Sequence, residues 1–223
     1  MTTLAFLLDV DNTLLNNDGI KADFDRQIEV ELGPKLTQRF WDIYEQVREE
    51  KSVIDIPLAL KLMREQTSLQ ELDKQTYERV HAIFFDYPFA NALYPQVLAT
   101  LQHLRQLGTT VIVSDGDPIF QARKIINSQL AAAVEERVLL YVHKQEHLDE
   151  VMKLYPADHY VMIDDKPQIL VDSKDIMGNR LTTIFVHQGK YADQQPAHFA
   201  PEITVEHIAD LQQFTAEQFL QKR

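Results

Sequence analysis

The chain has 223 residues, 45% of them hydrophobic, which is enough for a sizeable core and a second, smaller one. Cysteine is absent, so disulfide bonds, thiolate nucleophiles and sulfur-bound metal sites are excluded. The net charge of −12 disfavours binding to nucleic acid, and no apolar run approaches the about 18 residues of a membrane span. We therefore expect a soluble, cytoplasmic protein without a nucleic-acid or membrane partner.

The first predicted element is a short apolar run, LAFLL at 4–8, which is typical of a buried β-strand. It is followed at once by Asp9 and Asp11, with Thr13 just beyond. Carboxylates at the end of a buried strand are costly unless a cation, a hydrogen-bond donor or a shared proton compensates them. This segment is therefore the first candidate for a functional site.

Residues 16–93 show helical periodicity and no convincing buried strand. The apolar positions of one expected helix follow i, i+3, i+4, i+7 spacing: Phe40, Ile43, Tyr44 and Val47. Pro34 and Pro57 stand where helices could begin. We interpret this stretch as an inserted helical module. Its aromatic residues are expected to form its core, with the alternative that one faces a crevice: Trp41, Tyr44, Phe84 and Phe85.

From Tyr94 onward, continuous apolar runs alternate with helical patterns. The runs, which are typical of parallel strands buried on both faces, are 110–114, 137–142, 159–163 and 182–186. A helix is expected at 95–107 with Gly108 as its C-terminal cap, and another with Asp117 as N-cap and Pro118 as first residue. The alternation predicts a doubly wound, parallel α/β sheet that includes the strand at 4–8. The predicted domains are an α/β core, 1–15 and 94–223, and an all-helical domain, 16–93.

Ligands of open α/β sheets bind beyond the carboxyl ends of the strands. The residues at those predicted ends are Asp9, Asp11, Ser114, His143, Lys144, Asp164 and Asp165. With many carboxylates and no sulfur, the metal ion that suits such a site is a hard cation with oxygen ligands, most simply Mg²⁺. The polar loop at 187–193 follows the last predicted strand and is expected to border the pocket.

The order of these residues resembles the motifs of the haloacid dehalogenase-like superfamily, in its aspartate-nucleophile phosphatase branch. The first motif, Asp-x-Asp-x-Thr after an apolar strand, is similar to 9–13 (DVDNT). The second is a Ser or Thr ending a strand, here Ser114, and the third a Lys ahead of a helix, here Lys144. The fourth, an acidic pair ending a strand, is matched at 164–165, and the helical insertion stands where this family places its C1 cap.

The resemblance implies a role for each of these residues. Asp9 is the expected nucleophile, which forms an aspartyl-phosphate, and Asp11 the expected general acid and base. Ser114 and Lys144 are expected to bind the phosphoryl oxygens. The Mg²⁺ ligands are expected to be Asp9, the backbone carbonyl of Asp11 and the acidic pair, either member of which can be the direct ligand: Asp164 and Asp165.

The function that follows is hydrolysis of a small phosphorylated metabolite by a Mg²⁺-dependent phosphatase. The dehalogenase branch of the family lacks the second aspartate, because a halide leaves without a proton, so Asp11 favours phosphoryl transfer. Two alternatives stay open at this point. One is a phosphomutase that uses the same aspartyl-phosphate, and the other is a catalytically idle member that binds a phosphorylated ligand or a protein. The sequence indicates no particular protein partner.

Overall fold

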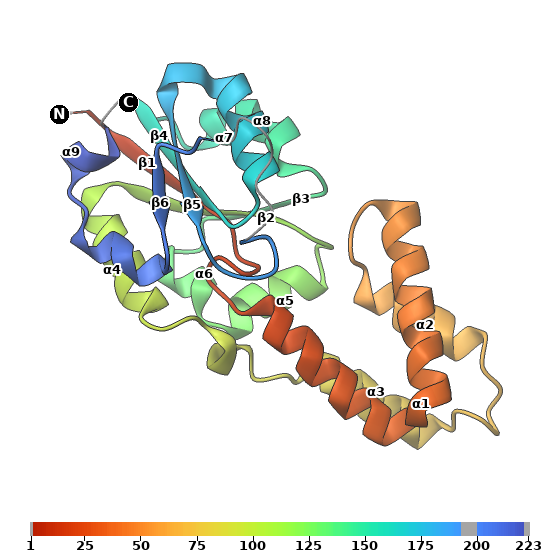
Figure 1. Ribbon diagram of the computed structural model, residues 1–223. Coiled ribbons are helices and arrows are strands. Elements are labelled where there is room, and N and C mark those ends of the chain that lie inside the picture. Colours follow the sequence, from red (N-terminus) through yellow and green to blue (C-terminus); the bar gives the residue numbers. More distant parts are fainter. Residues whose placement is uncertain (1, 193–199, 221–223) are drawn as a thin grey trace.

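A six-stranded parallel sheet forms the centre of the computed structural model, which describes residues 2–192 and 200–220 (Figure 1). Its strands are β1 (Leu4–Leu8), β2 (Thr109–Asp115), β3 (Val138–Tyr141), β4 (His159–Asp164), β5 (Leu181–Val186) and β6 (Ile203–Val205). Their order is β3-β2-β1-β4-β5-β6, and every pairing is parallel. The doubly wound α/β architecture is thus confirmed, with β1 at the point where the strand order reverses.

Two strands differ from the prediction. β6 was not expected, because its three residues are too few to show a pattern, and it forms only as the edge partner of β5. β3 is shorter than 137–142, and all four of its residues are half-buried rather than buried. The prediction that it is covered on both faces was wrong, since β3 is the opposite edge strand and pairs only with β2.

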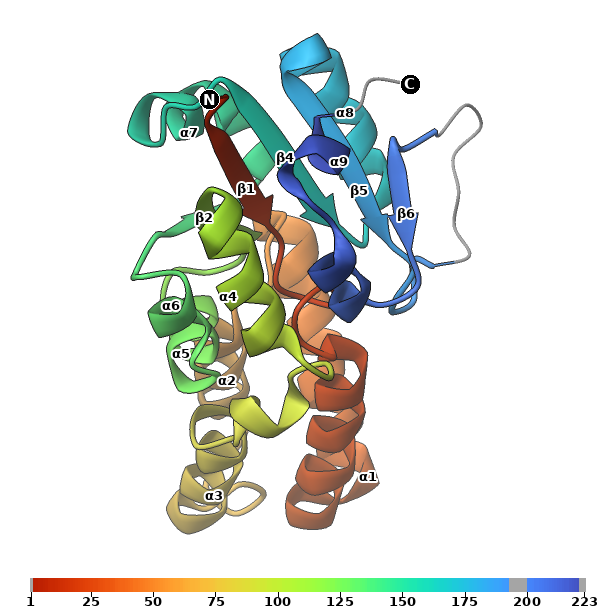
Figure 2. The same ribbon diagram turned by 90° about the vertical axis from the view of Figure 1, so that its left-hand side faces the viewer.

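Helices cover both faces of the sheet (Figure 2). One face carries α4 (Val97–Leu107), α5 (Phe120–Asn127), α6 (Leu130–Ala133), η4 (Ile208–Gln213) and α9 (Ala216–Phe219). The other carries α7 (Leu148–Leu154) and α8 (Pro167–Met177), which is followed by η3 (Gly178–Arg180). Alternate residues of β1 serve the two layers: Phe6 and Leu8 pack in the first core, and Ala5 and Leu7 in the second. This double burial explains the continuous apolar run.

The helix after β2 begins later than predicted. α5 starts at Phe120 rather than at Pro118. Asp117 nevertheless does the work of a cap, because its Oδ1 accepts hydrogen bonds from the backbone N–H groups of Ile119 (2.9 Å) and Phe120 (2.8 Å). The acidic residue was therefore interpreted correctly, while the turn that precedes the helix was not recognised.

Three helices between β1 and β2 extend beyond the carboxyl ends of the strands (Figure 1). They are α1 (Asn17–Lys51), α2 (Ile56–Glu65) and α3 (Lys74–Phe85), followed by η1 (Phe89–Ala92), so the helical prediction is confirmed. α1 is interrupted at Gly33, whose φ of 70° and ψ of 168° are not helical, and Pro34 starts its second half. The second half consequently turns back toward the sheet. Among the described residues, no helix is long and apolar enough to cross a membrane.

Aromatic contacts anchor these helices on the core. The ring centroid of Phe120, in α5, lies 5.8 Å from Phe85, 5.9 Å from Phe89 and 6.4 Å from Phe24. Arg123, also in α5, donates from Nε to the carbonyl oxygen of Phe85 at 2.7 Å. The helical insertion and the sheet therefore share a hydrophobic cluster. The boundaries 1–15, 94–223 and 16–93 stay a prediction, and residues 193–199 and 221–223 of the expected core lie outside the described residues.

Gly108, between α4 and β2, provides a test of how closely this turn packs against β1. It caps α4, as predicted, by donating its N–H to the carbonyl oxygen of Leu104 at 3.0 Å. A Cβ atom here would lie 2.4 Å from the carbonyl oxygen of Leu4 in β1. Since backbone cannot yield cheaply, Gly108→Ala is expected to lower the free energy of unfolding by about 1–3 kcal/mol, measured by urea denaturation.

The matched control for this substitution is Gln106→Ala, at an exposed position of the same helix. It should change the free energy of unfolding by less than about 0.5 kcal/mol. Equal stability of the two variants would show that the backbone at Gly108 can move away from Leu4 at no cost in free energy.

Candidate active site

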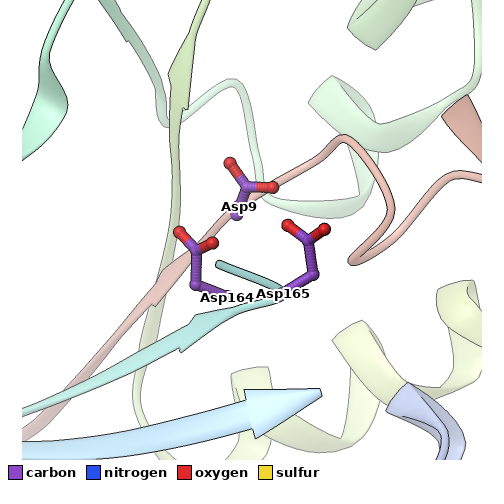
Figure 3. A group of neighbouring side chains, drawn as sticks. All are labelled: Asp9, Asp164 and Asp165. Carbon is purple, nitrogen blue, oxygen red and sulfur yellow. The ribbon is translucent and has the colours of Figure 1, made fainter. Parts of the chain in front are cut away.

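Three buried carboxylates meet at the carboxyl ends of the two central strands. Asp9 follows β1, Asp164 ends β4, and Asp165 comes next; they are 3%, 0% and 0% exposed. One oxygen from each lies within 4.8 Å of the others (Figure 3). The parallel register places Leu8 beside Ile163, and the N–H of Asp9 donates to the carbonyl oxygen of Ile163 at 3.0 Å. Strand pairing therefore brings together acids that are far apart in the sequence.

Lys144 lies among these carboxylates and neutralises part of their charge. It is 1% exposed, and its Nζ lies 2.5 Å from Asp9 Oδ1 and 2.6 Å from Asp164 Oδ2. It begins η2 (Lys144–His147), and its backbone N–H donates to Asp115 Oδ1 at 2.8 Å. Burial opposes its charge, but the carboxylates of Asp164 and Asp9 outweigh this and raise its pKa, so Lys144 stays protonated.

The carboxylate cluster keeps acceptors that no described residue satisfies. Asp9 Oδ2 and both carboxylate oxygens of Asp165 are buried without a hydrogen-bond partner among the described residues. Burial raises the pKa of Asp165, and the charges of Asp164 and Asp9 add to this effect. Unsatisfied, buried carboxylate oxygens are the donor set of a hard divalent cation, so the residues fit such an ion.

Lys166 is a second lysine beside the cluster that sequence reasoning did not assign to the site. Burial opposes its charge, but Asp9, Asp164 and Asp165 together raise its pKa. The three carboxylates and the two lysines, Lys144 and Lys166, thus sum to a formal charge of −1. A divalent cation in the cluster would bring this sum to +1, which suits an anionic ligand.

Ser114 is the second-to-last residue of β2, at the strand end where the motif predicted it. Its side chain is buried, and its Oγ accepts a hydrogen bond from Gln121 Nε2 at 3.0 Å. The same Oγ donates its hydrogen to the carbonyl oxygen of Asp115 over a long 3.5 Å, a weak contact that a phosphoryl oxygen could replace. Gln121, which sequence reasoning missed, therefore orients the Ser114 hydroxyl.

Asp11 is paired with a lysine that was also missed. Lys124 Nζ lies 2.8 and 3.0 Å from the two carboxylate oxygens of Asp11, and 3.1 Å from Asn17 Oδ1 at the start of α1. Lys124 is only 4% exposed, so this pair is largely removed from water. A signal was present in the sequence: Asp117, Gln121 and Lys124 form one polar face of the expected helix, and all three are buried.

The loop after β5 supports the loop that carries Asp11. Gln188 Nε2 donates to the carbonyl oxygens of Asn12 (3.3 Å) and Thr13 (3.2 Å). Gly189 approaches so closely that a Cβ there would lie 2.5 Å from the Cβ of Asn12, whose φ is 64°. The described part of 187–193 thus borders the site as expected, and Asp193 lies outside the described residues.

A cavity of about 480 Å³ lies between the sheet and the helical insertion. Its apolar lining includes Ile20, Phe24, Trp41, Tyr44, Ile56 and Phe120. Of the four aromatic residues considered for the crevice, Trp41 and Tyr44 therefore face it, whereas Phe84 and Phe85 pack in the core. His143 also lines the cavity.

The cavity ends next to the carboxylate cluster. Asp11, a predicted site residue, lines it, and so do Asp115 and Lys166, which directly follow the predicted site residues Ser114 and Asp165 in the chain. Asp9 itself is not a lining residue, and neither are Ser114, Lys144, Asp164 and Asp165. The structure thus brings every predicted site residue to one end of the sheet, with Asp11 between the cluster and the cavity.

The chain belongs to the haloacid dehalogenase-like hydrolases, whose family model matches residues 3–168. It is similar to a protein of Burkholderia xenovorans LB400 that is described as a haloacid dehalogenase-like hydrolase. The two share 43% identity and a TM-score of 0.86, over 99% of this chain and 100% of that chain. The protein is accordingly a hydrolase of this family. No curated protein matches the chain.

Structures of lower identity share the fold. A HAD hydrolase of Bacillus subtilis, described as bound to magnesium, has 16% identity and a TM-score of 0.61, with 95% of this chain and 97% of that chain covered. A 2-haloacid dehalogenase of Pseudomonas syringae pv. Tomato DC3000 has 17% identity and a TM-score of 0.64, with 95% and 96% covered. At such identities the likeness concerns the fold alone.

The ion pairs of Lys144 lead to a prediction about stability. Lys144→Met would leave buried carboxylates uncompensated, so the free energy of unfolding in EDTA is expected to fall by about 3–5 kcal/mol. Mg²⁺ should restore more stability to this variant than to the wild type, because it meets a more negative cluster. Urea denaturation with EDTA or with Mg²⁺ measures both effects.

Lys153→Met, an exposed lysine of α7, is the matched control and should change little in either condition. A Lys144→Met protein as stable as this control would show that the carboxylates are protonated in the folded state and need no cation.

Proposed function

We propose that the protein is a Mg²⁺-dependent phosphatase that hydrolyses a small phosphorylated metabolite through an aspartyl-phosphate on Asp9. The observation that carries this proposal is the position of Asp11. Its carboxylate lines the cavity two residues after Asp9, and a buried lysine, Lys124, binds both of its oxygens. Lys124 thus orients a carboxyl group beside the cavity, where it could exchange a proton with a bound ester.

Asp9, Asp164, Asp165 and the backbone carbonyl of Asp11 are the groups that would hold Mg²⁺. A carboxylate and a phosphate repel each other by about 4 kcal/mol per pair of unit charges at 4 Å and an effective dielectric of 20. When bound, Mg²⁺ neutralises this repulsion and draws charge from the phosphoryl oxygens. Two oxygens of Asp165 and one of Asp9, which have no hydrogen-bond partner in the described part of the chain, support this assignment.

In the first step, a carboxylate oxygen of Asp9 forms a bond to phosphorus while the bond from phosphorus to the ester oxygen breaks. Asp11, which must enter this step protonated, gives its proton to that departing oxygen, which leaves as an alcohol. The Ser114 hydroxyl and the Lys144 ammonium bind the phosphoryl oxygens as negative charge spreads over them. Lys144 also holds Asp9 in place through its ion pair.

In the second step, Asp11 takes a proton from a water molecule that attacks the phosphorus of the aspartyl-phosphate. The bond between phosphorus and Asp9 breaks, so inorganic phosphate and the free carboxylate are formed. Asp11 thereby regains the proton that it gave in the first step. A halide leaves carbon without a proton, so an acid at Asp11 favours a phosphate ester over a haloacid as the substrate.

The metal requirement is tested with p-nitrophenyl phosphate. Phosphate release should require Mg²⁺ and stop in excess EDTA, because the carboxylate cluster then repels the substrate. Vanadate should inhibit, since it can take the place of phosphate on Asp9. Turnover that continues undiminished in EDTA, with residual metal verified to be absent, would contradict the role given to the cluster.

Substitutions distinguish the roles of Asp9 and Asp11. Asp9→Asn removes the nucleophile, so turnover and aspartyl-phosphate should both be lost. Asp11→Asn keeps the size of the side chain but carries no proton, so kcat for alkyl phosphates should fall by about 10²–10⁴. Aryl phosphates should lose less in the first step, because their leaving groups need less protonation.

The Asp11→Asn enzyme should also accumulate an aspartyl-phosphate on Asp9, because no base is left to activate water. Acid quenching and peptide mass spectrometry measure this intermediate, with the Asp9→Asn enzyme as the blank. Equal losses on alkyl and aryl phosphates, without a trapped intermediate, would show that Asp11 serves only the structure.

A further inference from the structure

Two cations of α1 face the cavity from the helical insertion. Lys21 lies in the first half of α1 and Arg48 in the second, and both line the cavity. The turn at Gly33 brings the two halves together, so that Glu45 contacts both: Lys21 Nζ lies 3.6 Å and Arg48 Nη2 2.7 Å from its carboxylate oxygens. One carboxylate is thus shared by two cations.

Aromatic rings hold Lys21 at the cavity wall. Its Nζ lies 4.6 Å from the ring centroid of Tyr44 and 5.3 Å from that of Trp41. Burial lowers the pKa of Lys21; Glu45 opposes this, while the positive charges of Lys190 and Arg48 lower it further. Lys190 lines the same cavity from the loop after β5. Positive charge therefore gathers here, in a chain whose net charge is −12.

Three of the four acids that line the cavity are engaged by other groups. Asp11 is bound by Lys124, and Asp115 and Asp117 accept hydrogen bonds from backbone N–H groups. Glu49 is exposed on α1 beside Arg48. Lys21 and Arg48 consequently have Glu45 as their common counter-ion, through pairs that are about half exposed and therefore weak.

This pair of cations lines the same cavity as Asp11. Tyr44 also lines it, and Lys21 lies over the ring of Tyr44. A leaving group that receives its proton from Asp11 would therefore extend past Tyr44 toward Lys21 and Arg48.

We infer that Lys21 and Arg48 bind a second anionic group of the substrate, a carboxylate or a second phosphate, in exchange for Glu45. This inference rests on the proposed phosphatase activity and names its substrate class: small phosphomonoesters with an anionic group at the far end of a short chain. The guanidinium of Arg48 can bind such a group with two parallel hydrogen bonds. A cavity of about 480 Å³ suits a molecule of this size.

Three substrates of equal chain length test this inference, each assayed with Mg²⁺. They are propyl phosphate, 3-phosphonooxypropanoate and 1,3-propanediol bisphosphate, which end in a methyl group, a carboxylate and a phosphate. The wild type is expected to show a kcat/KM at least about tenfold higher for one or both charged substrates than for propyl phosphate. In Lys21→Gln and in Arg48→Gln this ratio should fall by about tenfold, and Arg48→Lys should retain part of it.

Lys35→Gln is the matched control, because Lys35 is an exposed lysine of the same helix that does not line the cavity; the ratio should stay as in the wild type. Circular dichroism and thermal unfolding establish that each variant is folded. Equal kcat/KM for all three substrates, or a ratio that Lys21→Gln and Arg48→Gln leave unchanged, would overturn this inference while the phosphatase activity stands. If the protein hydrolyses neither p-nitrophenyl phosphate nor any of the three substrates, both this inference and the proposed phosphatase activity are overturned.

Discussion

The ion pairs of Lys144 with Asp9 and Asp164 are the interaction on which the rest of the site depends. Isolated carboxylates in a nearly dry environment are unstable as charged groups, and the usual result is protonation. A buried ammonium within 2.6 Å of two of them offsets much of that cost. The compensation is incomplete, because Asp165 has no partner among the described residues. Buried acceptors without a partner lower the stability of the fold, and a positively charged ligand would satisfy them.

The residues around the carboxylate cluster are also held by buried polar partners. Lys124 binds Asp11, and Gln121 binds Ser114, so a single helix, α5, orients two of the residues that would act on a substrate. α5 also carries Phe120, on which the helical insertion packs. Lys124 further contacts Asn17, the first residue of α1. The position of the insertion and the orientation of Asp11 are therefore linked through adjacent turns of one helix.

A hydrolase of this family has to separate two tasks, and the structure assigns them to different parts of the chain. Most groups expected to bind and transfer phosphate lie at the ends of β1, β2 and β4, which pair on both sides, whereas Lys144 follows the edge strand β3. Eight of the residues that line the cavity, and would face the remainder of a substrate, come from α1. Because α1 turns back at Gly33, residues from both of its halves reach the cavity.

Much of this organisation was predictable from local patterns. A strand buried on both faces is continuously apolar, and four of the five predicted runs match such strands closely. Polar residues at the ends of these runs are therefore easy to recognise. Parallel strands also place their carboxyl ends at one edge, so Asp9, Ser114, Lys144, Asp164 and Asp165 could be expected together before any coordinates. Short β6 and half-buried β3 lack that pattern, because an edge strand has only one partner to pack beside.

The sequence by itself therefore determined the strand ends, the helical insertion and the chemical types gathered at the site. Only the tertiary structure decided the partners of those residues. Lys124 is 113 positions from Asp11, and Lys144 is 135 from Asp9, and no local periodicity reports contacts over such separations. The face that α1 presents to the cavity likewise depends on the backbone at Gly33, which reverses the helix direction. Pairings of this kind arise from packing between elements, whereas the elements themselves arise from neighbours in the chain.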